Sequence, residues 1–170
     1  MIYGITGNAA KKGTKEVLAD LIAFFKKSKI KYYISDKIKD VLPPGIPVHK
    51  ASTFVRKIDV IISIGGDGTF LETVKALGNN PVPILGVNVG TLGFMSEVVP
   101  GKLKDFIADI ERNNFRIEEM CMLSCYNNKE KILYGINEIV IDKFNFTGII
   151  ELEIYYNNDF VLRFLADGVI

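Results

Sequence analysis

Apolar and polar positions follow a regular pattern along the first hundred residues. Four short apolar runs have the length and composition of strands and lie at residues 2–5, 31–34, 59–64 and 82–87. Most residues of the third run are β-branched, as a strand buried on both faces requires. Helical spacing after the first run predicts one apolar stripe, formed by Val17, Leu18, Leu21, Ile22 and Phe25. A second helix should separate the third and fourth runs, so we expect parallel strand pairing.

The pattern changes character after residue 100. One more helical stripe comprises Leu103, Phe106, Ile107 and Ile110, and the later apolar runs, at 132–141, 148–156 and 160–165, read as strands joined by polar turns. We therefore expect an α/β fold with a Rossmann-like parallel sheet over residues 1–100. A connecting helix at 101–118 should lead to the start of an antiparallel all-β domain at 119–170. That domain looks incomplete, because the chain stops inside an apolar run, and we expect the sequence to continue.

Charge and composition exclude several functions. The chain has 21 Lys and Arg against 20 Asp and Glu, so its net charge of +1 offers no field for nucleic acid. The locally dense Lys26, Lys27, Lys29 and Lys31 fit a solvated helix end. No apolar run approaches the roughly 20 residues that span a bilayer, and Met1 does not open a signal peptide, so we expect a cytoplasmic protein without a membrane partner.

The cysteine and histidine content argues against several kinds of site. Cys121 and Cys125 would lie about 13 Å apart in an extended strand, which is too far for a disulfide. His49 is the only histidine, so the chain offers neither a structural zinc site nor a Ser-His-Asp arrangement. We expect no metal site made by protein residues alone.

Candidate chemistry concentrates directly after the third apolar run. Gly65, Gly66 and Gly68 should allow positive φ and let the backbone approach a ligand closely. Thr69 and Glu72 have the spacing of a capping box, so a helix should begin at this loop. Free N–H groups at such a helix end attract phosphate, although the segment matches neither GxGxxG nor a P-loop.

Asp67 is the most informative residue of this loop, because a carboxylate in a phosphate cradle repels its ligand unless it has another task. It could accept a hydroxyl proton, hydrogen-bond a sugar, or help bind the magnesium ion of a nucleoside triphosphate. The bland alternative is a Gly-Asp-Gly turn that only reverses the chain. A second glycine-bearing segment, residues 86–94, follows the fourth run. Both segments should share the crevice beyond the carboxyl ends of the strands, where α/β sheets bind ligands.

At this point the sequence resembles a known family. A GGDGT segment occurs in diacylglycerol and sphingosine kinases and, loosely, in phosphofructokinases, so alone it indicates only phosphoryl transfer. The run Asn88-Val89-Gly90-Thr91-Leu92-Gly93-Phe94 looks like the NxGxLGF segment of NAD kinases. Asn137-Glu138 and Ala166-Asp167-Gly168 resemble two further motifs of that family in the right order.

The resemblance implies transfer of the terminal phosphoryl group of ATP or polyphosphate, with Mg²⁺, to the adenosine-ribose 2′-hydroxyl of NAD. By this resemblance Asp67 contacts the acceptor ribose and accepts the proton. The phosphate side of the site would comprise Gly65, Gly66, Gly68 and Thr69. Asn137 and Glu138 would hold the adenosine. Asp167 would lie near the nicotinamide half, contributed across a subunit interface as in family oligomers, so we expect a homodimer or homotetramer.

Alternatives remain open at several of these positions. Asn137-Glu138 could be ordinary polar residues that point inward within a strand, and Asp167-Gly168 could be an ordinary strand terminus. We expect Phe94 and Leu92 to belong to the core. A lipid kinase with the same glycine loop, or a nucleotide-binding module without turnover, are the other functional interpretations. The family pattern continues past the third motif, whereas this chain stops at Ile170, so we expect residues 1–170 alone to lack kinase activity.

Overall fold

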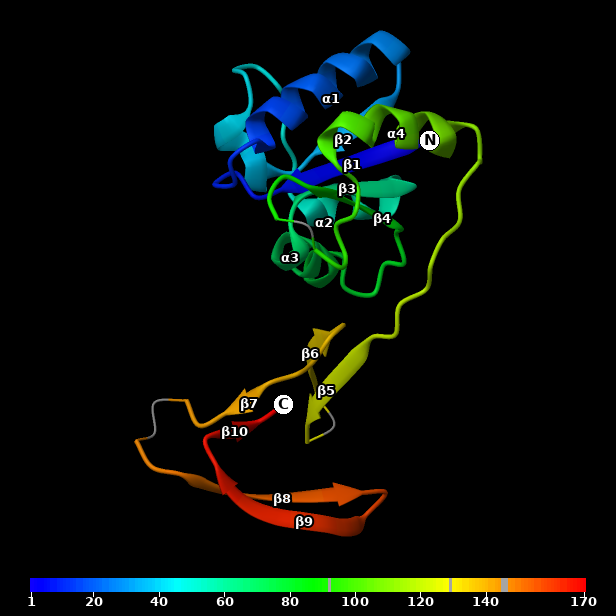
Figure 1. Cartoon of the computed structure of the whole chain (residues 1–170). Helices are drawn as coiled ribbons and strands as arrows, with labels where there is room; N and C mark the ends of the chain where they lie inside the picture. Colours follow the sequence, from blue (N-terminus) through cyan, green and yellow to red (C-terminus); the bar gives the residue numbers. More distant parts are fainter. Residues whose placement is uncertain (92, 129, 145–146) are drawn as a thin grey trace. The chain divides into compact units, whose positions relative to one another are not determined.

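The computed structural model describes residues 1–91, 93–128, 130–144 and 147–170. Two compact units make up the chain, Met1–Glu119 and Met120–Ile170, coloured from blue to yellow-green and from yellow to red in Figure 1. Each unit is described by itself. None of the helices in the described ranges is long and apolar enough to cross a membrane.

A four-stranded parallel sheet forms the centre of the first unit and confirms the predicted α/β fold. Its strands are β1 (Ile2–Gly7), β2 (Lys31–Ile34), β3 (Val60–Gly65) and β4 (Ile84–Asn88). The spatial order is β2-β1-β3-β4, and each neighbouring pair is parallel. Gly7 pairs with Ile64 and Gly65 with Asn88, so β1, β3 and β4 end at the same edge. The register therefore brings the loops that follow these three strands together.

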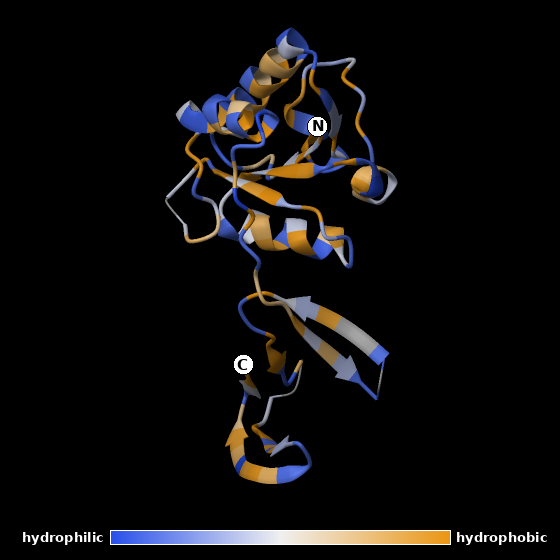
Figure 2. Ribbon diagram, turned by 90° about the vertical axis from the view of Figure 1, so that its right-hand side faces the viewer, coloured by the Kyte–Doolittle hydropathy of each residue, from blue (hydrophilic) through white to orange (hydrophobic). Residues whose placement is uncertain are grey.

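Helices cover both faces of this sheet. In Figure 1, α1 (Thr14–Ser28) and α4 (Leu103–Glu111) lie on one side, and α2 (Ala51–Phe54) and α3 (Asp67–Leu77) on the other. Alternation along the strands explains the two layers, because successive side chains point to opposite faces. Thus Ile62 packs in the cluster of α1 and α4, whereas Ile61 packs with residues of α2 and α3. Figure 2 shows the central strands mainly in orange and the helices with both orange and blue residues.

The predicted stripe of α1 is confirmed, because all five of its apolar residues are buried. The stripe of α4 is confirmed except at Phe106, which is 46% exposed.

The carboxyl end of α4 is tied to the sheet by Tyr3, whose hydroxyl donates to Glu111 Oε1 at 2.8 Å. Burial and the adjacent Glu111 carboxylate raise the pKa of Tyr3, so its hydroxyl stays protonated as a donor. Three short 3₁₀ helices complete the unit: η1 (Asp36–Val41), η2 (Val55–Lys57) and η3 (Pro100–Lys102).

The second unit consists of antiparallel strand pairs, which confirms the predicted change of pattern. The strands are β5 (Leu123–Asn127), β6 (Glu130–Gly135), β7 (Ile141–Asp142), β8 (Ile150–Tyr156), β9 (Asp159–Ala166) and β10 (Gly168–Val169). They pair as β5–β6, β7–β10 and β8–β9. Asn157 and Asn158, at the predicted turn between β8 and β9, have φ values of 51° and 72°. Two successive residues of positive φ are typical of a tight hairpin turn.

One strand of the second unit was predicted wrongly. The expected continuous strand at 132–141 is divided into β6 and β7, with a bend between them. The bend brings the Glu138 carbonyl so close to Gly135 that a Cβ at position 135 would overlap it. Apolar periodicity continues through such a bend, so the pattern alone predicts one strand where the structure has two.

Candidate active site at the carboxyl edge of the parallel sheet

Three loops meet at the edge where β1, β3 and β4 end. The loop after β1 is tied to β3, because Asn8 N donates to Ile64 O at 3.0 Å. The loop after β4 is tied to the next residue of β3, because Val89 N donates to Gly65 O at 2.9 Å. The glycine loop after β3 therefore lies between the loops after β1 and β4. Both of these loops are held by carbonyl groups of the last two residues of β3. This arrangement brings residues 65–69 beside residues 88–91 and 93–96, as the order of the strands predicts.

Asp67 is the first residue of α3, and its carboxylate holds the loop after β4. Oδ2 accepts from Phe94 N at 2.8 Å, and Oδ1 accepts from Met95 N at 3.0 Å and Ser96 N at 3.2 Å. The N–H of Phe94, then that of Met95, lowers the pKa of Asp67 below its ordinary value of 3.8. The approach is so close that a Cβ on Gly93 would overlap the Asp67 carboxylate. In this conformation Asp67 is a charged anchor for residues 94–96.

The glycines of the loop do not have the expected positive φ. Among the described residues, the glycines with positive φ are Gly13, Gly45 and Gly78. Close packing explains Gly65, because a Cβ there would overlap the side chain of Thr69. Gly66 is extended, with φ of −149°, and a Cβ on Gly68 would meet no atom within 4 Å. The loop thus needs a glycine at position 65 for packing, whereas position 68 is sterically open.

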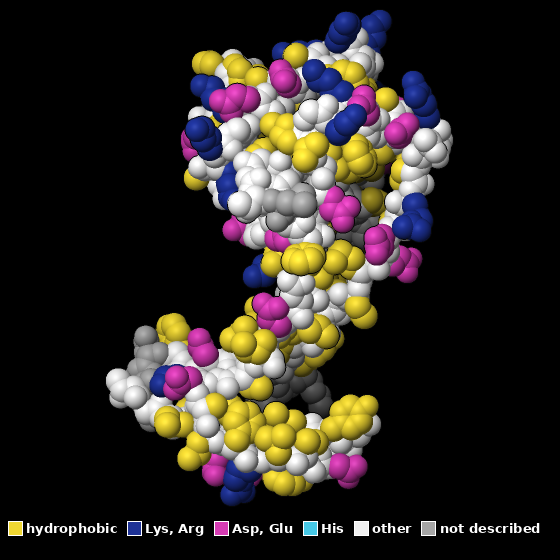
Figure 3. Space-filling model, viewed as in Figure 1, with side chains coloured by type: hydrophobic (Ala, Val, Ile, Leu, Met, Phe, Trp, Pro, Cys, Tyr) yellow, Lys and Arg dark blue, Asp and Glu magenta, His cyan; other side chains and the backbone are white. Residues whose placement is uncertain are grey.

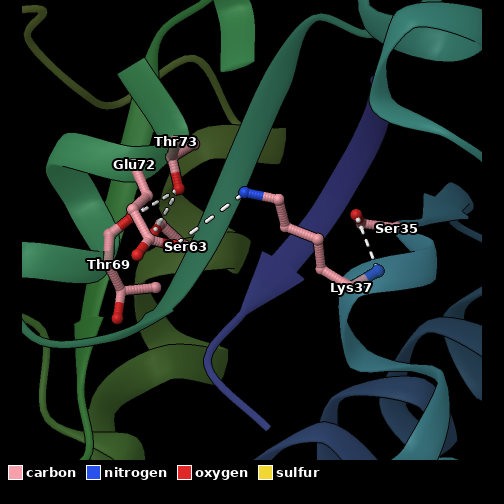
Figure 4. Close-up of polar contacts among 6 residues, drawn as sticks. All are labelled: Ser35, Lys37, Ser63, Thr69, Glu72 and Thr73. Atoms are coloured by element: carbon pink, nitrogen blue, oxygen red, sulfur yellow. Dashed lines mark hydrogen bonds and ion pairs between the residues drawn. The ribbon is translucent and has the colours of Figure 1, made fainter. Parts of the chain in front are cut away.

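The predicted capping box is also wrong. Helix α3 begins at Asp67, with Gly66 as a cap residue that contributes no side-chain hydrogen bond. Thr69 already lies inside the helix and is buried. Figure 4 shows the local polar contacts: Thr73 Oγ1 donates to Thr69 O at 2.8 Å, and Ser63 Oγ lies 2.9 Å from Thr73 Oγ1.

The contacts of Glu72 and Thr73 fix α3 against its neighbours. Glu72 Oε2 lies 3.8 Å from Lys37 Nζ, an exposed ion pair that joins α3 to η1, while Ser35 Oγ accepts from Lys37 N (Figure 4). Because the Thr73 hydroxyl proton is used toward Thr69 O, Ser63 is the donor in the buried Ser63–Thr73 contact. A buried hydroxyl pair thereby links β3 to α3 directly behind the glycine loop.

The loop after β4 is shaped by Asn88. Its Oδ1 accepts from Gly90 N at 2.7 Å, and its Nδ2 donates to Thr91 O at 2.8 Å. The expectation that Phe94 belongs to the core is wrong, since its side chain is 96% exposed. Its backbone N–H faces the Asp67 carboxylate, and the ring is left on the surface. Leu92, the other residue expected in the core, lies outside the described residues.

Lys11 also belongs to this edge, although the sequence pattern did not indicate it. Its Nζ lies 3.7 Å from the position of a Cβ on Gly66 and 3.3 Å from that of a Cβ on Gly90. The segment Asn8-Ala9-Ala10-Lys11-Lys12-Gly13-Thr14 offers one usable signal, a turn-forming asparagine and a glycine on either side of a lysine.

The remaining candidate residues lie in the second unit. Asn137 and Glu138 are exposed and occupy the bend after β6 rather than a strand. Asp167 lies between β9 and β10, and its Oδ1 is 2.6 Å from Lys143 Nζ. The Asp167 side chain is 77% exposed. The structure thus brings together the candidates of the first unit, Asp67, Gly65, Gly66, Gly68 and Thr69, and describes the other three within their own unit.

Comparisons with known proteins agree with this architecture. The sequence model of the ATP-NAD kinase N-terminal domain matches residues 4–115. The chain is 31% identical over 171 residues to an NAD kinase of Caldicellulosiruptor saccharolyticus, covering 100% of this chain and 60% of that protein. It is 36% identical over 115 residues to an NAD kinase of Bacteroides fragilis, covering 66% of this chain and 40% of that protein.

Two solved structures share the fold. Yeast NADH kinase complexed with NADH matches with a TM-score of 0.84 and 22% identity, over 99% of this chain and 56% of that one. An NAD kinase from Archaeoglobus fulgidus in complex with ATP matches with a TM-score of 0.67 and 18% identity, over 99% of this chain and 59% of that one.

A parallel α/β sheet followed by antiparallel strands is therefore the architecture of the nucleotide kinases that this chain matches. The family match covers well over half of its residues, and the chain belongs to the NAD kinase family. It spans about 60% of the length of the full-length curated relatives with which it aligns end to end.

Proposed function

We propose that this chain forms part of an enzyme that phosphorylates the adenosine-ribose 2′-hydroxyl of NAD to make NADP. ATP or inorganic polyphosphate is the phosphoryl donor. Family membership supports the reaction, and one observation supports the place: a carboxylate, Asp67, starts α3 at the edge where three loops converge. Ligands of parallel sheets bind beyond this edge.

The donor phosphates are proposed to lie along Gly65, Gly66, Gly68 and Thr69. Because Gly66 has no side chain to cap α3, the N–H groups of the first turn are available to phosphate oxygens. A Cβ on Gly68 would meet no atom within 4 Å, so a ligand atom has room where another residue would have its Cβ. Thr69 supports this loop from inside, through its contact with Gly65.

Mg²⁺ would accompany the donor and neutralise the charge that develops on the transferred phosphoryl group. The described residues contain no group of three or more His, Cys, Asp or Glu that could hold a metal ion. The chain's own residues fit a cation that arrives with the phosphates better than one held in a protein cage. Asp67 is the carboxylate of the glycine loop itself, and each of its oxygens would supply a single ligand to the metal ion.

Asp67 is proposed to hydrogen-bond the acceptor hydroxyl and to accept its proton. While the N–H groups of Phe94, Met95 and Ser96 occupy its oxygens, the lowered pKa makes it a weak base. Phosphoryl transfer passes through a loose transition state, so orienting the hydroxyl matters more than early proton removal. If the Asp67 carboxylate exchanges one backbone N–H for the ribose hydroxyl, it can first orient this hydroxyl and then accept its proton.

Asn137, Glu138 and Asp167 are proposed to contact NAD, the first two at the adenosine and the third near the nicotinamide half. All three side chains are exposed in the second unit. Asp167 would have to share or release its ion pair with Lys143 to bind a ligand group. The proposed assembly is a homodimer or homotetramer in which Asp167 serves a neighbouring subunit.

A coupled assay of NADP formation, on the complete protein that carries this chain, tests the proposal. Asp67→Asn should reduce turnover by about 10²- to 10⁴-fold, the usual effect of removing a general base. Asp20→Asn is the matched control, because Asp20 is an exposed aspartate on α1. Its turnover should equal that of the unsubstituted protein.

The proposal fails if the protein forms no NADP, or if Asp67→Asn turns over as fast as Asp20→Asn. Phosphorylation of a diacylglycerol or sphingoid base without NADP formation would instead identify a lipid kinase. Nucleotide binding without any product would identify a binding module.

A further inference from the structure

The Lys11 ammonium group lies close to both glycine segments of the candidate site. The two Cβ positions that its Nζ approaches, 3.7 Å away on Gly66 and 3.3 Å away on Gly90, belong to loops that follow different strands. Because both residues are glycines, the space between their backbones and the ammonium group holds no side chain of their own. The Lys11 ammonium therefore lies between the loop after β3 and the loop after β4.

The backbone around Lys11 is fixed by local hydrogen bonds. Asn8 Oδ1 accepts from Ala10 N at 2.9 Å, and Asn8 O accepts from Lys11 N at 3.2 Å and from Thr14 Oγ1 at 2.9 Å. Lys11 O in turn accepts from Thr14 N at 3.2 Å. These bonds order the loop and limit the entropy lost when the side chain binds a ligand.

The same loop is held against its neighbour across the sheet edge. Gly13 has a φ of +93° and precedes α1 as its N-cap residue, and a Cβ there would lie 3.6 Å from Val89 Cβ. A residue with a side chain would be strained at this φ, so the turn that carries Lys11 toward the loop after β4 depends on glycine. Packing and backbone geometry thus place the root of Lys11 beside residues 88–90.

The charge of Lys11 is not neutralised within the described part of the chain. No described carboxylate lies within ion-pair distance of its Nζ. Asp67, the acidic residue of the glycine loop, is turned toward the N–H groups of residues 94–96 instead. An uncompensated ammonium beside two glycine segments favours an anionic ligand with several oxygens.

We propose that Lys11 binds the phosphate chain of the phosphoryl donor, beside the start of α3. The inference rests on the proposed function for the identity of the reaction, but not for the binding of the anion. The ligand chemistry is a chain of linked phosphates, which a nucleoside triphosphate and inorganic polyphosphate share. Lys11 touches the donor and has no contact with NAD.

Isothermal titration of the complete protein that carries this chain with inorganic tripolyphosphate, and separately with ATP and Mg²⁺, tests the inference without turnover. Lys11→Gln should weaken tripolyphosphate binding by about 10- to 100-fold, the range expected for one lost charge-assisted hydrogen bond. Lys11→Arg should retain most of the affinity, because it keeps the charge. Lys12→Gln is the matched control, since Lys12 is an exposed lysine of the same loop, and it should change the affinity less than twofold.

In the NADP assay on the complete protein, Lys11→Gln should raise the KM for the donor by a similar factor and leave the KM for NAD unchanged. An effect of Lys11→Gln on ATP alone would mean that Lys11 recognises the nucleoside rather than phosphate, and the proposal would be wrong. It would be wrong too if Lys11→Gln behaved like Lys12→Gln, or if the unsubstituted protein bound no tripolyphosphate. Binding that depends on Lys11 in a protein that makes no NADP would refute the proposed function and leave this inference standing.

Discussion

The two units of the chain use similar apolar strands in different ways. In the first unit these strands are enclosed between helices, and Tyr3, Ile5 and Ile62 are each 0% exposed. In the second unit none of the side chains whose burial the structure describes is buried, and large ones such as Phe160 and Leu165 are 56% and 69% exposed. Figure 3 shows hydrophobic side chains gathered over the β8–β9 hairpin. What differs is the second layer, which a strand pattern requires but does not itself provide.

The candidate site residues of the two units differ in the same way. Asp67 accepts three backbone N–H groups, and those groups belong to a loop that is itself tied to β3. The Asp167 side chain is exposed, and its described partner is Lys143. Geometry in the first unit is therefore determined by many mutually supporting contacts, whereas Asp167 can change partner at little cost.

Removing a phenylalanine from each unit should give the largest difference between them. Phe25 is 0% exposed and packs against Tyr3 and Tyr32, at centroid distances of 5.0 and 5.5 Å. Phe25→Ala should lower the free energy of unfolding by about 3–5 kcal/mol, because it leaves a cavity in the core. Phe160→Ala should lower it by less than about 1 kcal/mol, the scale of a cross-strand pair.

Urea denaturation of both variants, followed by circular dichroism, measures this difference. Equal losses of stability would show that the second unit has a core of its own in solution, and the comparison would break down.

Two glycines of one loop should separate packing from ligand binding. Gly65→Ala forces a Cβ into Thr69 and should lower the free energy of unfolding by about 1–3 kcal/mol. Gly68→Ala places its Cβ in open space and should change the stability by no more than about 0.5 kcal/mol. If donor phosphate lies over the loop, Gly68→Ala should nevertheless raise the KM for the donor, and Gly66→Ala should do the same.

Thermal unfolding and donor titration on the same samples make the test. An intact donor KM in both Gly66→Ala and Gly68→Ala would count against the phosphate cradle, and unchanged stability in Gly65→Ala would show that α3 can shift without cost.

Acid should loosen the Asp67 anchor, with the smallest of these effects. Backbone N–H groups lower the pKa of the folded carboxyl, so its contribution to stability is fully present above 3.8, the ordinary pKa. The contribution is lost as the pH falls below that value and through the lowered pKa. The amide resonances of Phe94, Met95 and Ser96 should shift with this titration in an NMR experiment.

The variant Asp67→Asn is the control, because its side chain does not titrate. Amide shifts that persist in this variant, or a midpoint above 3.8, would show that another group is responsible.

Much of the parallel sheet could be predicted because a strand buried on both faces must be apolar throughout. Strand β2 has the predicted bounds, and β1, β3 and β4 begin or end within a few residues of them. The start of α3 was misplaced because Gly66 and Gly68 read as loop residues by propensity. Tertiary contacts favour helix there, since Asp67 bonds to residues 94–96 and Thr69 packs on Gly65.

The placement of the two candidate loops at one edge of the sheet was predictable, but the contacts between them were not. The position of the glycine loop follows from the order of the strands alone. The link from Asp67 to Phe94 spans 27 residues, and the approach of Lys11 to Gly90 joins loops after different strands. Such pairings depend on register and packing, which local patterns do not contain. The functional roles of the candidate residues stay predictions in both units.

The consecutive carbonyl groups of β3 also restrict how this protein can change its length. The N–H groups of Asn8 and Val89 donate to the carbonyl groups of Ile64 and Gly65, so the loops after β1 and β4 both start at fixed positions on the end of β3. An insertion between residues 8 and 13 would break the bonds from Asn8 to Lys11 and Thr14 and move Lys11 away from the glycines. In contrast, a Cβ on Gly45 would meet nothing within 4 Å, so the connection around it has room for extra residues. Insertions and deletions should therefore accumulate near residue 45 and be rare in the loop that carries Lys11.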